Sequence, residues 1–139
     1  MNQRDGERSF EIAADFPVEP RRVFDSLVDA TVLKRIWGVQ QITVDARVGG
    51  QTVANFVTDG TDWSFTNTFT EIVPNASLAW MTHFASFPMK ETRVKAIVSR
   101  VADGSHLSVC MEHFESAAER DANREAWQRA LATLATMLV

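Results

Sequence analysis

Three polar side chains on the apolar faces of the predicted strands are the residues whose types could do chemistry. By the alternation of a strand, Asn67, Thr82 and His113 each share a face with apolar neighbours. Asparagine and threonine can orient a carbonyl group through hydrogen bonds, and histidine can move a proton near neutral pH. We take these residues as candidate polar groups of an otherwise apolar site.

No further pattern assigns catalysis. Alternation places Cys110 on the face opposite His113, which argues against a Cys–His pair. The histidines show no metal-ligand spacing, and Gly49-Gly50 lacks the lysine and helix of a phosphate loop. Glu71 and Arg93 could form a cross-strand pair at the mouth of the site. We predict no metal and no cofactor, leave the catalytic residues unknown, and favour a strand-end role for His113 over an acid–base one.

Aromatic side chains are abundant, with nine Phe, four Trp and no Tyr. A site built from these side chains would be strongly apolar and would have no tyrosine hydroxyl to act as an acid. The alternative is that the rings are simply core, since aromatic side chains dominate ordinary cores. The candidate ligand-binding residues are Trp37, Trp63, Phe65, Asn67, Phe69, Trp80, Thr82, Phe84, Met111, His113 and Trp127.

The elements that must position these residues follow from periodicity and turn signals. Apolar spacing predicts two short helices, one after Pro20 and one capped by Asp29 or Thr31 and ended by Trp37-Gly38. Ser116 with Glu119 is a capping-box signature that begins a long final helix, whose apolar face is Trp127, Leu131, Leu134 and Leu138. Period-two patterns predict strands at Ser9–Phe16, Gln41–Arg47, Gln51–Thr58, Asp62–Val73, Leu78–Ser86, Met89–Val101 and Ser105–Glu115.

This order predicts an α+β fold. No helix interrupts the run of strands after Gly38, so we expect an antiparallel sheet of about seven strands, curved around the long final helix. The length of 139 residues favours one domain spanning residues 1–139.

Composition narrows the partners and the compartment. A net charge of −4 argues against nucleic acid. Met1–Ser9 has no apolar segment of the signal-peptide kind, and the longest apolar stretch, Ala130–Val139, is too short for membrane insertion. A lone Cys110 excludes an internal disulfide and fits a reducing compartment. We expect a cytoplasmic protein.

Several segments, in this order, resemble the START-like (SRPBCC) superfamily and its branch of activators of heat-shock-protein-90 ATPase. They are FPVEPRRVFDSLVDATVLKRIWG (Phe16–Gly38), RVGG (Arg47–Gly50), EIVPNASLAW (Glu71–Trp80), TRVKAIVSRVADGSHLSV (Thr92–Val109) and EAWQRALATL (Glu125–Leu134). The resemblance implies a helix-grip fold with a deep apolar cavity between the sheet and the C-terminal helix.

The resemblance also implies function. Relatives bind hydrophobic molecules, so we predict the binding of a small hydrophobic ligand, without catalysis. The alternatives are a cyclase- or hydrolase-like enzyme using His113, and a chaperone-interaction module. The edge strands of an open sheet invite pairing, so a homodimer is a further option.

Overall fold

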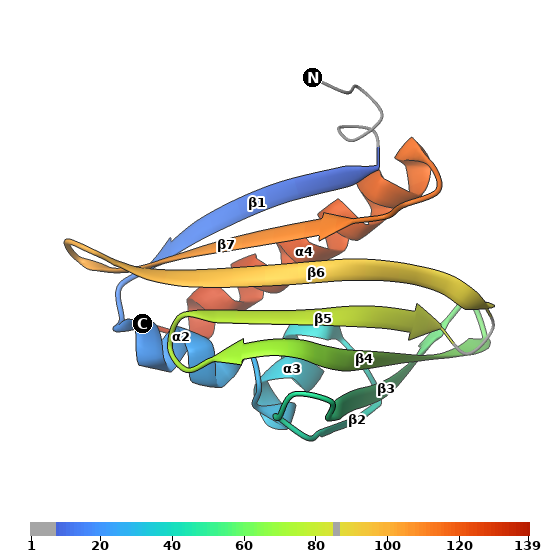
Figure 1. The fold of residues 1–139 in the computed structure, drawn as a ribbon, viewed down its shortest axis with the longest axis horizontal. Helices are drawn as coiled ribbons and strands as arrows, with labels where there is room; N and C mark the ends of the chain where they lie inside the picture. The colour runs from blue at the N-terminus through green and yellow to red at the C-terminus, as the bar shows by residue number, and fades with distance from the viewer. Residues whose placement is uncertain (1–7, 85–86) are drawn as a thin grey trace.

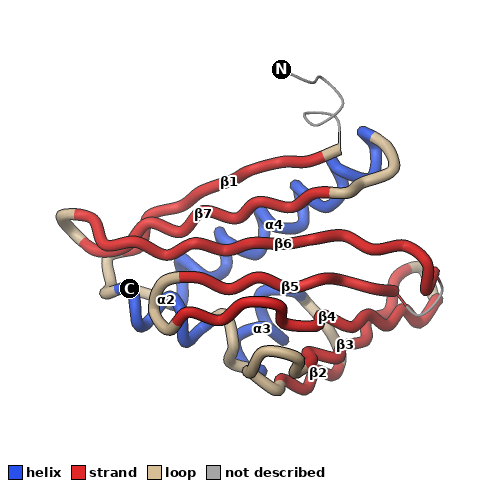
Figure 2. Tube along the Cα trace, viewed as in Figure 1, coloured by secondary structure: helices blue, strands red, loops and turns tan. Residues whose placement is uncertain are grey.

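The architecture is a single antiparallel sheet with helices on one of its faces (Figures 1 and 2). A computed structural model describes residues 8–84 and 87–139. The seven strands lie in the order β1-β7-β6-β5-β4-β3-β2. In chain order the elements are β1 (Ser9–Phe16), α2 (Pro20–Ser26), α3 (Ala30–Trp37), β2 (Gln41–Val44), β3 (Gln51–Thr58), β4 (Thr61–Val73), β5 (Ser77–Phe84), β6 (Phe87–Val101), β7 (Gly104–Glu112) and α4 (Ala117–Met137).

The long helix α4 runs behind the sheet across β7, β6 and β5, and α2 and α3 lie on the same side (Figure 1). This is the α+β helix-grip arrangement predicted from the sequence. The expected strand end at Ser86 and the polar stretch before Arg8 lie outside the described residues. No helix in the described ranges has the length and apolar character needed to cross a bilayer.

Local chemistry sets the helix ends. Asp29 caps α3 by accepting hydrogen bonds from the backbone N–H groups of Thr31 and Val32, at 2.9 and 3.3 Å. Gly38 ends α3 with a left-handed φ of 65°, which costs glycine little. Ser116 begins α4 because its Oγ accepts from the backbone N–H of Glu119 at 3.2 Å.

The core lies between the inner face of the sheet and the helices. Strand β7 alternates strictly, with Leu107, Val109 and Met111 buried on the inner face. The predicted apolar face of α4 meets them and is buried in full. Because a strand alternates with period two, the same alternation places Cys110 on the outer face.

Two strands end earlier than the sequence suggests. β2 ends at Val44 because the chain turns at Asp45, whose carboxylate accepts a hydrogen bond from Arg47 Nε at 2.9 Å. β7 ends at Glu112 because His113 adopts a φ of 75°, which leaves the extended region.

A β-bulge in β4 also corrects the expected Glu71–Arg93 pair. The register against β5 shifts between Phe69 and Glu71, so Glu71 faces outward rather than into the mouth of the site. There it accepts a hydrogen bond from Ser77 Oγ at 2.8 Å and lies 3.5 Å from Lys95 Nζ.

Candidate functional site

A cavity of about 470 Å³ lies between the inner face of the sheet and the helices α3 and α4. Strands β3 to β7 supply its floor, the C-terminal end of α3 one wall, and the middle of α4 the other. Its lining is Arg35, Ile36, Trp37, Gly38, Val39, Phe56, Val57, Phe65, Asn67, Trp80, Thr82, Phe84, Val94, Met111, Asn123, Ala126, Trp127 and Arg129.

Six aromatic side chains line the cavity. Trp37 is central, with ring centroids 5.9 Å from Phe65, 6.5 Å from Trp80 and 6.1 Å from Trp127. Trp80 and Trp127 are 6.3 Å apart, and Phe65 lies 6.0 Å from Phe84. These separations fall in the range of favourable ring pairs, so the rings hold one another in place. A flat apolar molecule would meet a wall that is already formed.

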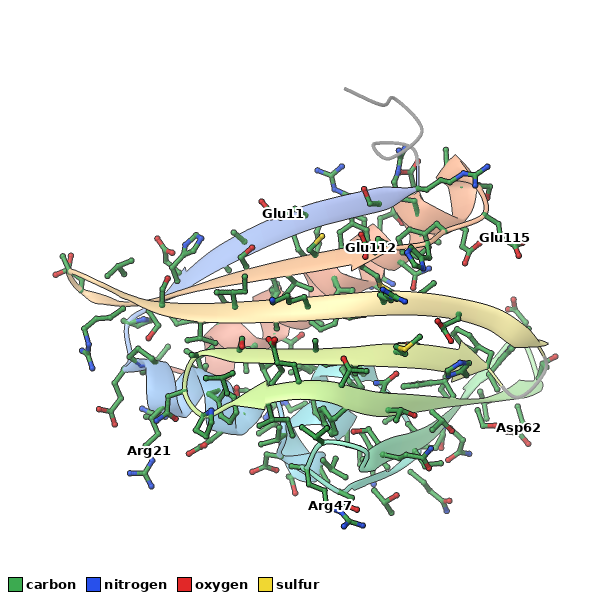
Figure 3. The ribbon with its side chains drawn as sticks, in the orientation of Figure 1. Glu11, Arg21, Arg47, Asp62, Glu112 and Glu115 are labelled. Atoms are coloured by element: carbon green, nitrogen blue, oxygen red, sulfur yellow. The ribbon has the colours of Figure 1, made fainter. Side chains whose placement is uncertain are left out.

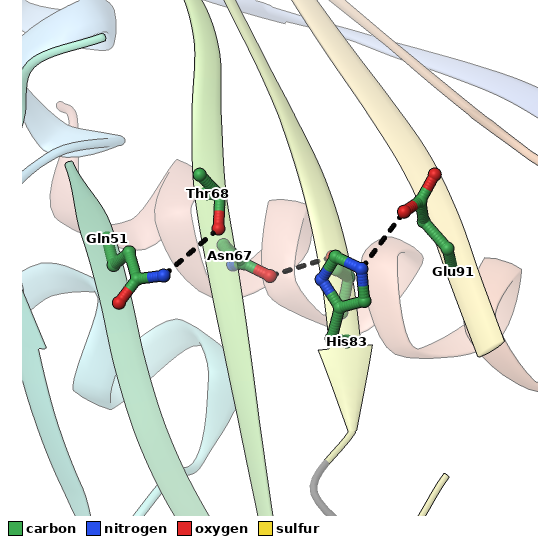
Figure 4. Close-up of polar contacts among 6 residues, drawn as sticks. Gln51, Asn67, Thr68, His83 and Glu91 are labelled. Atoms are coloured by element: carbon green, nitrogen blue, oxygen red, sulfur yellow. Dashed lines mark hydrogen bonds and ion pairs between the residues drawn. The ribbon is translucent and has the colours of Figure 1, made fainter. Parts of the chain in front are cut away.

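One buried polar pair lies on the cavity floor. The Thr82 hydroxyl donates to Asn67 Oδ1 at 2.7 Å, and both side chains are buried. The contact joins β4 to β5, with α4 visible behind the strands (Figure 4). Within the described part of the chain, the amide nitrogen of Asn67 has no protein acceptor. Asn67 can therefore donate to an oxygen atom of a bound molecule.

The pair belongs to a polar row that crosses four strands. Thr52, Asn67, Thr82 and Thr92 are successive register partners on β3, β4, β5 and β6, and all four are buried. The Thr92 hydroxyl oxygen is fully buried and has no hydrogen-bond partner in the described structure. A buried hydroxyl without a partner lowers stability.

Two matched substitutions test this row. Thr92→Val removes the unpartnered hydroxyl at nearly constant volume and should raise the free energy of unfolding by about 1 kcal/mol. Thr82→Val removes the donor to Asn67 and should lower it by about 1 kcal/mol. Urea unfolding of both variants measures the difference. Equal effects in the same direction would contradict the hydrogen-bond assignment.

The mouth of the cavity is marked by the exposed members of the lining. They are Arg35, Gly38, Val57, Ala126 and Arg129, from α3, β3 and α4. The two arginines are the charged groups of the described lining, and no Asp or Glu side chain is among them. The cavity therefore has rings and the Asn67–Thr82 pair inside and two cationic side chains at its opening.

Comparison with known proteins identifies the family of this chain. Residues 17–139 match the family described as activator of Hsp90 ATPase homolog 1-like protein. The chain belongs to this family. The match confirms the resemblance inferred from the sequence, and the fold agrees with the helix-grip prediction.

Solved structures show the same fold as this member of the Hsp90-activator-homologue family. Protein CV1439 from Chromobacterium violaceum has a TM-score of 0.85 and 20% identity, over 94% of this chain and 97% of that one. Mll3558 from Rhizobium loti has a TM-score of 0.76 and 26% identity, over 92% and 94% of the two chains. DynU16, from the dynemicin biosynthetic locus, has a TM-score of 0.79 and 17% identity, over 95% of this chain and 47% of that one. Among curated proteins, no significant match was found.

Most of the residues that the sequence singled out meet at the cavity of this family member. Trp63 and Phe69 do not line it. Trp63 stacks on Phe56 with centroids 6.5 Å apart, and Phe69 is buried behind Trp80 at 6.2 Å. The predicted residues that line the cavity are Trp37, Phe65, Asn67, Trp80, Thr82, Phe84, Met111 and Trp127.

His113 does not reach the cavity, contrary to the prediction from alternation. Its side chain is 48% exposed and its Nε2 lies 3.8 Å from Glu112 Oε1. The cause is the positive φ at His113, which turns the chain so that Phe114 goes inward instead. Phe114 is buried and stacks on Phe10 at 5.8 Å. An aromatic residue directly after the histidine was the available signal.

Trp37 and Trp127 were predicted as binding residues, but the other helix residues of the lining, among them Asn123 and Ala126, were not. Asn123, Ala126 and Trp127 follow helical spacing, so the face could have been read from Trp127 alone. Arg35 and Arg129 were not among the predicted binding residues. Their place at the mouth depends on how α3 and α4 approach each other, which no local pattern specifies.

The outer face of the sheet carries paired charges rather than a reactive site. His83 Nε2 lies 3.0 Å from Glu91, a contact drawn with that of Gln51 and Thr68 in Figure 4. Burial, and then the carboxylates of Glu112 and Glu11, raise the pKa of the Cys110 thiol; both acids are labelled in Figure 3. A raised pKa disfavours the thiolate, so Cys110 is a poor nucleophile at neutral pH.

Proposed function

We propose that this chain binds a small hydrophobic molecule in the cavity between the sheet and α4. The observation that carries the proposal is the cavity of about 470 Å³, walled by rings, with the Asn67–Thr82 pair on its floor. Burial of apolar surface contributes about 25 cal/mol per Å². The Asn67 amide supplies a hydrogen bond that fixes the ligand's orientation. The proposal treats residues 1–139 as one domain in the cytoplasm.

The chemistry of the lining supports binding over acid–base catalysis. Among the described lining residues there is no Asp, Glu, His or Cys that could exchange a proton near neutral pH. His113, the residue that a cyclase- or hydrolase-like mechanism needed, lies outside the cavity. Chaperone contact and a homodimer stay predictions. A pull-down with the chaperone tests the first, and analytical sedimentation tests the second.

Obstructing the mouth of the cavity should weaken ligand binding without harming the fold. Ala126 is exposed and lines the mouth, so Ala126→Phe places a ring in the opening. We expect this variant to bind 4-biphenylacetate at least about tenfold more weakly, which corresponds to about 1.4 kcal/mol. Titration calorimetry measures the affinity, and quenching of tryptophan emission provides a second readout because Trp37, Trp80 and Trp127 line the cavity.

Ala122→Phe is the matched control. Ala122 is exposed one turn earlier on α4 and is not part of the lining, so its variant should bind as the parent does. The proposal fails if no hydrophobic probe binds the parent chain. It also fails if Ala126→Phe and Ala122→Phe bind equally well.

A further inference from the structure

We infer that the cavity selects hydrophobic molecules that carry one carboxylate, which Arg35 and Arg129 hold at the mouth. This inference rests on the proposed function and specifies its ligand class. Both arginines line the cavity, one from α3 and one from α4, and both are exposed. A guanidinium presents a planar fork of donors that matches the two oxygens of a carboxylate.

The mouth of the cavity is positively charged, whereas the chain as a whole is negatively charged. The sequence has 18 acidic and 14 basic side chains, for a formal net charge of −4. The described lining nevertheless holds two arginines and no carboxylate. A cavity adapted to neutral ligands would have no need of this local excess, whereas an anionic ligand gains from it by direct attraction.

Both arginines are available to a ligand. Three other arginines lie close to a carboxylate: Arg21 is 3.6 Å from Asp25, Arg47 is 2.9 Å from Asp45, and Arg120 is 3.0 Å from Asp121. For Arg35 and Arg129, no carboxylate of the described residues lies within 4.0 Å. A ligand carboxylate at the mouth would therefore meet guanidinium groups that need not first leave another ion pair.

The polar groups also define an orientation. The arginines are exposed at the opening, whereas Asn67 is 3% exposed on the floor. The rings of Trp37 and Trp127 line the helix side of the cavity. The ligand therefore has its carboxylate outward, an apolar and preferably flat body against the rings, and room for one oxygen acceptor near the Asn67 amide.

A pair of probes that differ only in charge tests the inference. 4-Biphenylacetate carries a carboxylate, and 4-biphenylacetamide replaces it with a neutral amide of the same shape. Calorimetric titration of the full chain should show the carboxylate binding about fivefold more tightly, as expected for an exposed ion pair. This preference should shrink as salt is added, because salt screens exposed charges.

Variants identify the source of the preference. Arg35→Gln with Arg129→Gln should remove the preference, so that the carboxylate and the amide bind the variant with equal affinity. The control, Arg22→Gln with Arg124→Gln, makes the same change in net charge on exposed helix positions outside the lining and should keep the preference.

The outcomes separate this inference from the proposed function. Equal affinity of the two probes for the parent chain overturns the carboxylate preference but leaves hydrophobic binding intact. Loss of the preference in the control double variant also overturns it, because net charge alone would then explain the effect. If neither probe binds, the inference and the proposed function fail together.

Discussion

Trp80→Ala is expected to lower the free energy of unfolding by about 3–5 kcal/mol. Trp80 is 3% exposed, and its ring contacts Trp37, Trp127 and Phe69 at 6.5, 6.3 and 6.2 Å. Alanine removes the indole ring, which belongs both to the cavity wall and to the buried core. The three neighbouring rings then lose the contact that they share. Equilibrium urea unfolding, followed by near-ultraviolet circular dichroism, measures the loss.

Trp63→Ala is the matched control for this prediction. Trp63 is half-buried on the same face of the sheet and stacks on the lining residue Phe56, but does not itself line the cavity. Its removal should cost at most about 2 kcal/mol, because less apolar surface is lost. Equal losses for the two tryptophans would contradict the central place given to Trp80.

The second large effect is expected from Gly104→Ala, which should cost at least about 3 kcal/mol. Gly104 has a φ of 153°, and a Cβ atom there would lie within 3.0 Å of three backbone atoms, of which Phe16 O is the nearest. Backbone of the adjacent β1 cannot move aside as a flexible side chain can. The thermal midpoint and urea midpoint of the variant measure the loss.

Gly60→Ala separates close approach from backbone conformation. Gly60 also has a positive φ, 76°, but a Cβ atom there meets nothing within 4 Å. We expect a cost of about 1 kcal/mol, from the left-handed conformation alone. If Gly104→Ala lowered the free energy of unfolding no more than Gly60→Ala does, the start of β7 would not pack closely against β1.

The fold was predictable because its signals are local and agree with one another. Alternation located the strands, Ser116 and Asp29 cap helices as predicted, and Gly38 ends α3. The absence of any helix between the strands after Gly38 was enough to predict an antiparallel sheet. Each of these inferences needs only a residue and its near neighbours.

The site was predictable only in part, because alternation gives the face of a residue and not its distance from the cavity. Phe69 and Trp80 both face inward, yet only Trp80 reaches the lining. Two local irregularities also changed which face of the sheet a side chain takes. They are the bulge before Glu71 and the positive φ of His113. Arg35 came to the mouth through helix packing, which is a tertiary effect.

The central claim is tested most directly by a crystal structure of the chain grown with 4-biphenylacetate. We predict density for the two rings of the probe inside the cavity, against Trp37 and Trp127, with its carboxylate toward the mouth. The account would be contradicted by a cavity closed by its own side chains, or by probe density found only on the outer face of the sheet.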